Sequence, residues 1–223
     1  GRFLVRMENL DQARCEPRFE PTILADLAWL GLTWDGPVRR QSDCLPAYRT
    51  ALDMLTGRGV VYPCFCTRGD ITREIEAMAE APQGPDGPLY PGTCRSLPLV
   101  ERQARLARGT AHALRLDVAR ALAQLGAPRL SFRETGHGPA GEAGESPVQP
   151  ALLGDIVLGR KDTGFSYHLA VVVDDADQGI SLVTRGDDLF AATHVQRLLQ
   201  ALLGLPEPRY RHHALIRDAH GRR

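Results

Sequence analysis

Three cysteines and one tyrosine fall in two short clusters with the spacing of metal ligands. Cys64 and Cys66 form a Cys-x-Cys pair, and Tyr90 and Cys94 form a Tyr-x-x-x-Cys pair. Thiolate is a soft ligand that zinc favours, and structural zinc sites use four protein ligands. Tyrosine is a rare ligand because its hydroxyl ionises only near pH about 10, and His112 is the substitute that the sequence offers. On residue types alone, three buried thiols beside a core tyrosine are the alternative.

A second group of residues has the chemistry to bind a small carboxylate. Arg185 follows the apolar run 180–183, where a strand is expected to hand over to a helix, and Tyr167 lies just before the apolar run 169–173. Ligands of open α/β sheets bind at the carboxyl ends of strands. A forked guanidinium and a phenol at such an end are groups that fix a carboxylate. The alternative is a core tyrosine and an arginine paired with one of the two aspartates that closely follow it.

Three carboxylates stand at predicted element boundaries. Glu8 ends a predicted strand over residues 2–8, where its residue type alone favours a solvated turn. Asp174 and Asp175 follow the apolar run 169–173 and invite a metal assignment. A helix start is the simpler interpretation of these two, because carboxylates there accept hydrogen bonds from free backbone donors.

Alternating strands and helices are predicted to position these residues. Helices are expected over 17–30, 46–55, 68–80, 98–108 and 193–203, and strands over 2–8, 60–62, 112–118, 129–134, 152–158 and 210–216. This order predicts an α/β fold with a Rossmann-like, mostly parallel sheet. Residues 1–62 and 161–223 are expected to form its two halves, and residues 63–160 an inserted subdomain. The segment 135–150 is rich in Gly, Pro and Glu and is predicted to be a mobile loop.

Composition limits the class of protein. The chain has 223 residues and a formal net charge of zero, which argues against a general basic nucleic-acid binder but permits local basic patches. No apolar run approaches the ~20 residues of a membrane span. Five cysteines, an odd number, fit a reduced cytoplasmic protein better than a disulfide framework. We therefore expect a cytoplasmic protein without a membrane partner.

Several motifs carry a resemblance to a known family. The segments concerned are Phe3–Asp11, Tyr62–Arg68, Leu89–Arg95, Ser166–Ala170 with the following Val-Val-Asp-Asp, Arg185–Asp187 and Leu199–Tyr210. Together they resemble the catalytic domain of class I glutamyl-tRNA synthetases, and most closely the short paralogous family, the glutamyl-Q tRNA(Asp) synthetases. Met7, Asn9 and Leu10 depart from the family pattern.

The resemblance implies both a reaction and a site. It implies ATP-dependent activation of L-glutamate, with Mg²⁺ accompanying ATP, and transfer of the glutamyl group to queuosine in the anticodon of tRNA(Asp). It places Glu8, Tyr167 and Arg185 in the glutamate pocket, with Glu8 toward the amino group. It assigns zinc to the Cys-x-Cys and Tyr-x-x-x-Cys residues, and no residue need be a covalent nucleophile. A monomer is expected.

Two signature motifs of class I synthetases, HIGH and KMSKS, do not occur in the sequence. The ATP-binding residues are therefore unknown, and the simplest expectation is a fragment that lacks both ends. An ordinary glutamyl-tRNA synthetase that charges tRNA(Glu) is one alternative. A non-catalytic, zinc-braced RNA-binding module is the other, and the departures at Met7, Asn9 and Leu10 leave room for it.

Overall fold

The computed structural model describes residues 1–11, 13–78, 81–85, 87–126, 130–161, 164–216 and 218–219. Its helices are α1 (Phe19–Trp29), α2 (Leu45–Gly57), α3 (Arg68–Ala77), α4 (Leu99–Ala107), α5 (Val118–Gln124), α6 (Tyr167–Gln178) and α7 (Phe190–Leu203), with 3₁₀ turns η1 (Gln41–Asp43), η2 (Pro150–Leu153) and η3 (Asp187–Leu189). Its strands are β1 (Arg6–Met7), β2 (Arg39–Arg40), β3 (Val61–Cys64), β4 (Gln83–Gly84), β5 (Gly87–Pro88), β6 (Ala113–Leu116), β7 (Ser131–Glu134), β8 (Gly144–Pro147), β9 (Val157–Gly159), β10 (Leu182–Gly186) and β11 (Arg209–His213). The predicted ends at residues 80 and 129 lie outside the described residues.

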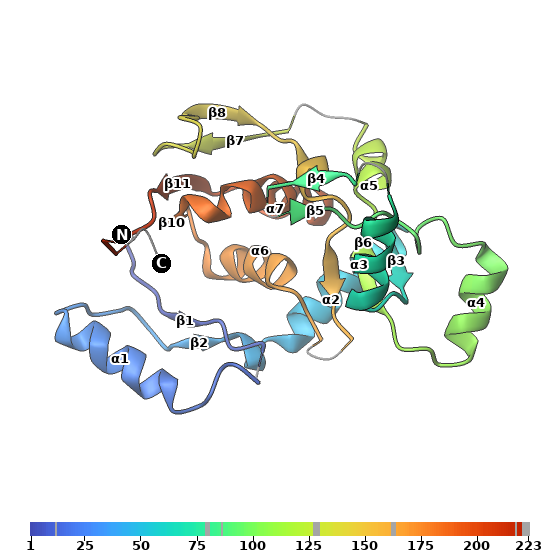
Figure 1. Cartoon of the computed structure of the whole chain (residues 1–223). Coiled ribbons are helices and arrows are strands. Elements are labelled where there is room, and N and C mark those ends of the chain that lie inside the picture. The colour runs from blue at the N-terminus through green and yellow to red at the C-terminus, as the bar shows by residue number, and fades with distance from the viewer. Residues whose placement is uncertain are drawn as a thin grey trace.

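The fold is α/β with parallel and antiparallel sheets. Strand β1 pairs in parallel with β2. A four-stranded sheet has the order β10-β11-β7-β8, in which β10, β11 and β7 run parallel and β8 runs antiparallel to β7. Strands β3, β6 and β9 form an antiparallel sheet on the other side of the molecule (Figure 1). The register of β10 on β11 sets Arg185 opposite His212. Among the described residues, no helix combines the length and apolar character needed to cross a membrane.

Helix α6 occupies the centre of the molecule. It lies between the β1–β2 pair and the layer formed by α7, β10 and β11 (Figure 1). Its residues Leu169–Asp175 are all buried, and they join α2 and α7 in the main hydrophobic core. Helix α1 lies at the periphery and contributes no buried residue. The core therefore rests largely on α2, α6 and α7.

The expected helix start at Asp174 and Asp175 was wrong. The apolar run 169–173 belongs to α6, and the two aspartates lie in the interior of that helix. Both side chains are almost fully buried, and they accept hydrogen bonds from side chains instead of from backbone donors of a helix end. A short continuous apolar run fits a buried strand or a buried helix equally well, because periodicity separates them only when one side is solvated.

The segment 135–150 is more ordered than its composition predicts. Residues 144–147 form β8, which pairs with β7. In this pairing Ser131 lies opposite Pro147, and Glu134 lies opposite Gly144. Backbone pairing needs no large apolar side chain, so a Gly- and Pro-rich segment can still extend an existing sheet. The strand predicted over 152–158 was also partly wrong, since η2 occupies its beginning and β9 starts only at Val157.

The local signal for the start of α3 was predicted correctly. Thr67 and Asp70 form the capping box predicted for α3: the Asp70 N–H donates to Thr67 Oγ1 at 3.1 Å and the Thr67 N–H donates to Asp70 Oδ2 at 2.8 Å. The division into residues 1–62 with 161–223 and an insertion over 63–160 stays a prediction. In the structure, β7 of that insertion pairs with β11 at Tyr210 and Glu134.

Candidate functional site

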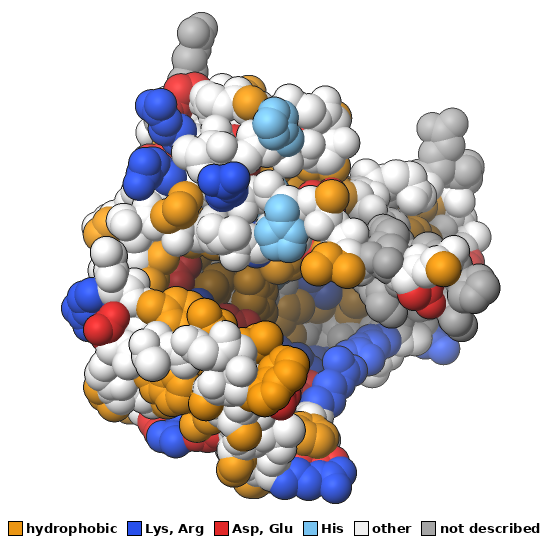
Figure 2. All heavy atoms as spheres, turned by 90° about the vertical axis from the view of Figure 1, so that its left-hand side faces the viewer, with side chains coloured by type: hydrophobic (Ala, Val, Ile, Leu, Met, Phe, Trp, Pro, Cys, Tyr) orange, Lys and Arg blue, Asp and Glu red, His pale blue; other side chains and the backbone are white. Residues whose placement is uncertain are grey.

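Glu8, Tyr167 and Arg185 line one groove. The groove lies between β1, α6 and β10, and its volume is about 290 Å³. The face shown in Figure 2 is hollowed at its centre, with hydrophobic side chains along the hollow. The three residues come from positions up to 177 apart in the chain, so only the fold brings them together. The predicted location of Arg185 at the carboxyl end of a strand is confirmed, since β10 ends at Gly186.

Tyr167 is the first residue of α6. Ser166 caps this helix, and its Oγ accepts a hydrogen bond from the Leu169 N–H at 3.4 Å. Burial raises the pKa of the Tyr167 hydroxyl, while the charge of Arg185 opposes this effect. The hydroxyl therefore stays protonated at neutral pH and can both donate and accept a hydrogen bond.

Three side chains hold Arg185 in place. Its Nη1 donates to Gln196 Oε1 at 2.8 Å, its Nη2 donates to Thr193 Oγ1 at 2.7 Å, and its Nε donates to His212 Nε2 at 3.2 Å. The alternative partner, one of the two following aspartates, is not among these three side chains, which α7 and β11 supply. Sequence reasoning missed these three residues, since nothing local links positions 193, 196 and 212 to Arg185.

Glu8 directly follows β1, and its cationic neighbour, Arg6, lies on that strand. Arg6 Nη2 lies 3.3 Å from Glu8 Oε1, and Arg6 Nη1 donates to Asp175 Oδ1 at 2.9 Å and to Gln178 Oε1 at 3.0 Å. Burial raises the pKa of Asp175, although Arg6 opposes that shift. The groove thus has the guanidinium of Arg185 and, beside the paired Arg6, the half-exposed carboxylate of Glu8. These two charges suit the carboxylate and the ammonium of an amino acid.

Beneath the groove, buried Asp174 anchors β2 and α2 to α6. It accepts from Arg39 Nε at 2.8 Å, from Gln41 Nε2 at 2.9 Å and from the Tyr48 hydroxyl at 2.9 Å. In the described part of the chain, Asp174 does not belong to the cluster of side chains that could hold a metal ion. The buried charge is paired and hydrogen-bonded, as buried carboxylates must be.

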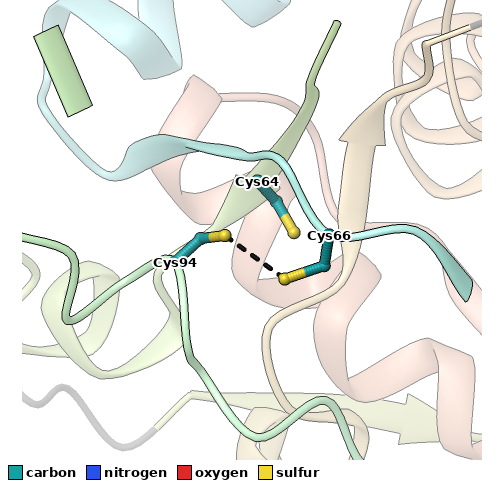
Figure 3. Close-up of side chains that lie close together, drawn as sticks. All are labelled: Cys64, Cys66 and Cys94. Carbon is teal, nitrogen blue, oxygen red and sulfur yellow. Dashed lines mark hydrogen bonds between the residues drawn. The ribbon is translucent and has the colours of Figure 1, made fainter. Parts of the chain in front are cut away.

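The cysteines predicted as metal ligands converge. Cys64, Cys66 and Cys94 have their sulfur atoms within 4.8 Å of one another, and they point toward a common centre (Figure 3). Cys66 Sγ lies 3.4 Å from Cys94 Sγ, and the Tyr90 hydroxyl lies 3.5 Å from Cys64 Sγ and 3.7 Å from Cys66 Sγ. Ligands at zinc bond lengths in a tetrahedron stand about 3.4–3.8 Å apart. The four residues therefore fit a tetrahedral zinc ion.

Backbone contacts favour a thiolate at this cluster. The Phe65 N–H donates to Cys94 Sγ at 3.3 Å. Burial opposes ionisation of Cys94, but this hydrogen bond and its neighbours outweigh burial and lower the pKa of the thiol. Burial raises the pKa of Tyr90, which makes its hydroxyl the weakest of the four candidate ligands. His112 is not in the cluster found among the described residues; its Nδ1 lies 3.0 Å from the Thr110 carbonyl oxygen.

A wide cleft lies between the cysteine cluster and the groove. Its volume is about 710 Å³, and its lining includes Cys66, Tyr90, Arg115, Lys161 and Tyr167. Tyr167 lines both cavities, so the cleft and the groove meet at this side chain. The two cavities are therefore neighbours, with Tyr167 at their boundary.

The arginines near α4 mostly have partners within the protein. Arg95 Nη1 donates to Asp155 Oδ2 at 2.7 Å, Arg102 Nη2 donates to the Arg95 carbonyl at 3.0 Å, and Arg105 pairs with Glu101. Contacts within the protein therefore account for these three side chains.

Comparison with known proteins identifies the family. The family described as tRNA synthetases class I (E and Q), catalytic domain, matches residues 1–223. The chain belongs to this family. The sequence is 50% identical to a glutamyl-Q tRNA(Asp) synthetase of Rhodobacter capsulatus over 100% of this chain and 78% of the relative. It is 44% identical to the protein of the same name from Nocardia farcinica, covering 100% of this chain and 64% of that protein. The predicted resemblance is confirmed.

Solved synthetase structures share the fold. A glutamate-tRNA synthetase from Elizabethkingia anophelis superposes with a TM-score of 0.78 at 25% identity, covering 97% of this chain and 44% of that chain. A glutamate tRNA ligase from Elizabethkingia meningosepticum, solved in complex with its amino acid, gives a TM-score of 0.77 at 24% identity, covering 97% of this chain and 43% of that one. The α/β class I synthetase fold is thereby established, and the chain spans less than half the length of these two synthetases.

Proposed function

We propose that this synthetase-family chain contributes the glutamate site to an enzyme that activates L-glutamate with ATP and transfers it to queuosine of tRNA(Asp). In the first step a glutamate carboxylate oxygen attacks the α-phosphorus of ATP, and pyrophosphate leaves. In the second, a hydroxyl of the queuosine cyclopentenediol attacks the glutamyl carbonyl, and AMP leaves. Alignment and charge stabilisation are enough for both transfers.

One observation carries the proposal. Glu8, Tyr167 and Arg185 line the same small groove, in a chain that matches glutamyl-Q tRNA(Asp) synthetases along its whole length. In the proposed complex Arg185 binds a carboxylate of glutamate, Glu8 accepts from the ammonium, and the Tyr167 hydroxyl lies beside the ligand. The cleft that borders the groove at Tyr167 supports approach of the RNA acceptor from that side.

The cysteine cluster is proposed to hold a structural zinc ion. Cys64, Cys66 and Cys94 supply three thiolates, and Tyr90 supplies the fourth ligand. Bound zinc would link β3 to the loop before α4 and so brace the wall of the cleft. The sulfur and oxygen spacings support this assignment.

The test is transfer of labelled glutamate by the full-length gene product that contains these 223 residues. The enzyme is given ATP with either queuosine-containing tRNA(Asp) or tRNA(Glu). Labelling of tRNA(Asp) alone is the expected result. Labelling of tRNA(Glu) would instead make the protein an ordinary glutamyl-tRNA synthetase, and labelling of neither by a folded protein would contradict a catalytic role.

A further inference from the structure

Three side-chain hydrogen bonds fix the guanidinium of Arg185. Of its five N–H donors, three bind Thr193, Gln196 and His212. Each terminal nitrogen keeps one further N–H beyond these three bonds, and Arg185 also makes a side-chain hydrogen bond with Tyr167. We propose that Thr193, Gln196 and the His212–Glu134 pair are positioning residues that orient these two donors toward the ligand carboxylate. This inference rests on the proposed glutamate site.

The His212–Glu134 pair determines what His212 can offer to Arg185. Glu134 Oε2 lies 2.6 Å from His212 Nδ1, and Glu134 Oε1 accepts from the His212 N–H at 3.0 Å and from the Gly136 N–H at 2.7 Å. An ionised Glu134 accepts the proton of Nδ1, so the unprotonated Nε2 of His212 accepts from Arg185. The strand pairing between β7 and β11 thus sets the orientation of an arginine on β10.

Burial makes this arrangement rigid. The side chains of Glu134 and His212 are fully buried, and Thr193 is buried as well. A buried polar group that loses its partner costs free energy, so each of these groups resists rotation away from Arg185. The Tyr210 ring, whose centroid lies 5.4 Å from Arg185 Cζ, restricts the guanidinium further.

A fixed guanidinium also favours one class of ligand. Two parallel N–H donors match the two oxygens of a carboxylate, whereas a carboxamide presents its own N–H₂ group to one of them. An arginine that could rotate would direct its donors to the amide oxygen alone and leave the N–H₂ group unopposed. We therefore expect the positioning residues to strengthen the preference for L-glutamate over L-glutamine.

The chain offers a matched control on the same helix. Gln196 and Gln200 lie one turn apart on α7, and each side chain is 2% exposed. Gln196 binds Arg185, whereas Gln200 Nε2 donates to the Tyr210 hydroxyl at 3.0 Å. Gln196→Leu and Gln200→Leu therefore remove similar buried amides, but only the first removes a hydrogen-bond partner of Arg185. The second keeps the Tyr210 ring beside Arg185 and removes only the bond to its hydroxyl.

The experiment compares Thr193→Val, Thr193→Ser, Gln196→Leu and Gln200→Leu in the full-length gene product. We expect Thr193→Val and Gln196→Leu to raise the KM for L-glutamate about tenfold or more, with a smaller change in kcat, and to weaken the preference over L-glutamine. Thr193→Ser keeps the hydroxyl, so its KM for L-glutamate and its preference over L-glutamine should be close to those of the wild type. Equal effects of Gln196→Leu and Gln200→Leu would overturn the proposal.

A second readout does not depend on glutamate. The Arg185 Nε–H, observed by ¹⁵N NMR after assignment through Arg185→Lys, should exchange slowly with solvent in the wild type and in Gln200→Leu. It should exchange faster in Thr193→Val and Gln196→Leu. Fast exchange in the wild type would overturn the positioning inference. Slow exchange in a protein that binds no glutamate would show that the surrounding side chains fix Arg185, and it would refute the glutamate site.

Discussion

Tyr48 on α2 donates from its hydroxyl to both carboxylate oxygens of Asp174 on α6 at 2.9 Å. This contact joins two core helices through a carboxylate that is wholly buried. Arg39 donates to the same carboxylate from β2. A single buried aspartate therefore connects α2 and β2 to the helix that carries Tyr167, and the position of the groove depends on it.

Asp174→Ala should destabilise the protein by about 3–5 kcal/mol, because it leaves the Arg39 guanidinium without its buried partner. Asp177→Ala removes a partner of the same arginine, at 2.9 Å, but this carboxylate is half exposed. Its loss should cost less than about 1 kcal/mol. Urea unfolding of the two variants measures the difference. Similar losses of unfolding free energy in the two variants would show that the burial of Asp174 does not increase its contribution to stability.

Glu8→Gln should weaken glutamate binding with little loss of stability. The side chain is half exposed, so its amide is readily solvated, but a neutral group attracts the ligand ammonium less strongly. We expect the KM for L-glutamate to rise about tenfold or more, as for loss of a hydrogen bond to a charged group. Glu76→Gln, an exposed substitution on α3, is the control. An unchanged KM in Glu8→Gln would remove Glu8 from the site.

Zinc content should depend on the three clustered cysteines. We expect about one zinc per chain in protein purified without chelator, and its loss in Cys94→Ser. Tyr90→Phe should retain zinc with lower affinity, since three thiolates remain and water can take the fourth position. Cys15→Ser and Cys44→Ser alter cysteines outside the cluster and serve as controls. Metal analysis by mass spectrometry decides the matter, and a Cys94→Ser variant with full zinc content would rule out the assigned ligand set.

Lys161, the only lysine in the chain, should support the same site. Its Nζ donates to the carbonyl oxygens of Phe65 and Cys66 at 3.1 Å each, and these residues form the turn of the Cys-x-Cys pair. Lys161→Met removes both contacts and is expected to lower zinc affinity about 10- to 100-fold, as loss of groups that orient ligands does. Arg68→Met changes another cation of the same cleft and should leave the affinity unaltered. Competition with a chromophoric chelator provides the measurement.

Stability should fall as the pH drops below about 6.5. Burial lowers the pKa of His212, Arg185 adds to this effect, and Glu134 opposes it. The unfolded chain therefore takes up a proton near pH 6.5 that the folded chain does not bind, so the free energy of unfolding decreases as the pH falls. Burial would raise the pKa of Glu134, but hydrogen bonds from His212 and Gly136 outweigh it and lower that pKa. Glu134 thus extends the loss of stability to more acidic pH.

Urea midpoints between pH 7.5 and pH 4 test this dependence. His212→Gln should flatten the decline in the upper part of the range. His213→Gln alters the adjacent exposed histidine of β11 and should keep the wild-type slope. If both variants behave alike, the dependence arises elsewhere in the chain.

The sequence by itself determined the features that depend on neighbouring residues and on residue chemistry. The capping box of Thr67 and Asp70, the end of a strand at Arg185 and the pairing of the Cys64 and Cys66 thiols all follow from short-range patterns. The family motifs also lie in short segments. Such features were predictable because a few consecutive residues contain all the interacting groups.

Only the tertiary structure decided which distant residues meet. Asp174 finds Tyr48 across 126 positions, and Arg185 finds His212 on the next strand of its sheet. A five-residue apolar run gave no sign that it was a buried helix, and so the buried aspartates after it were misplaced. Burial on all sides erases the periodicity that distinguishes a helix from a strand, and partners of a buried charge are set by how whole elements pack.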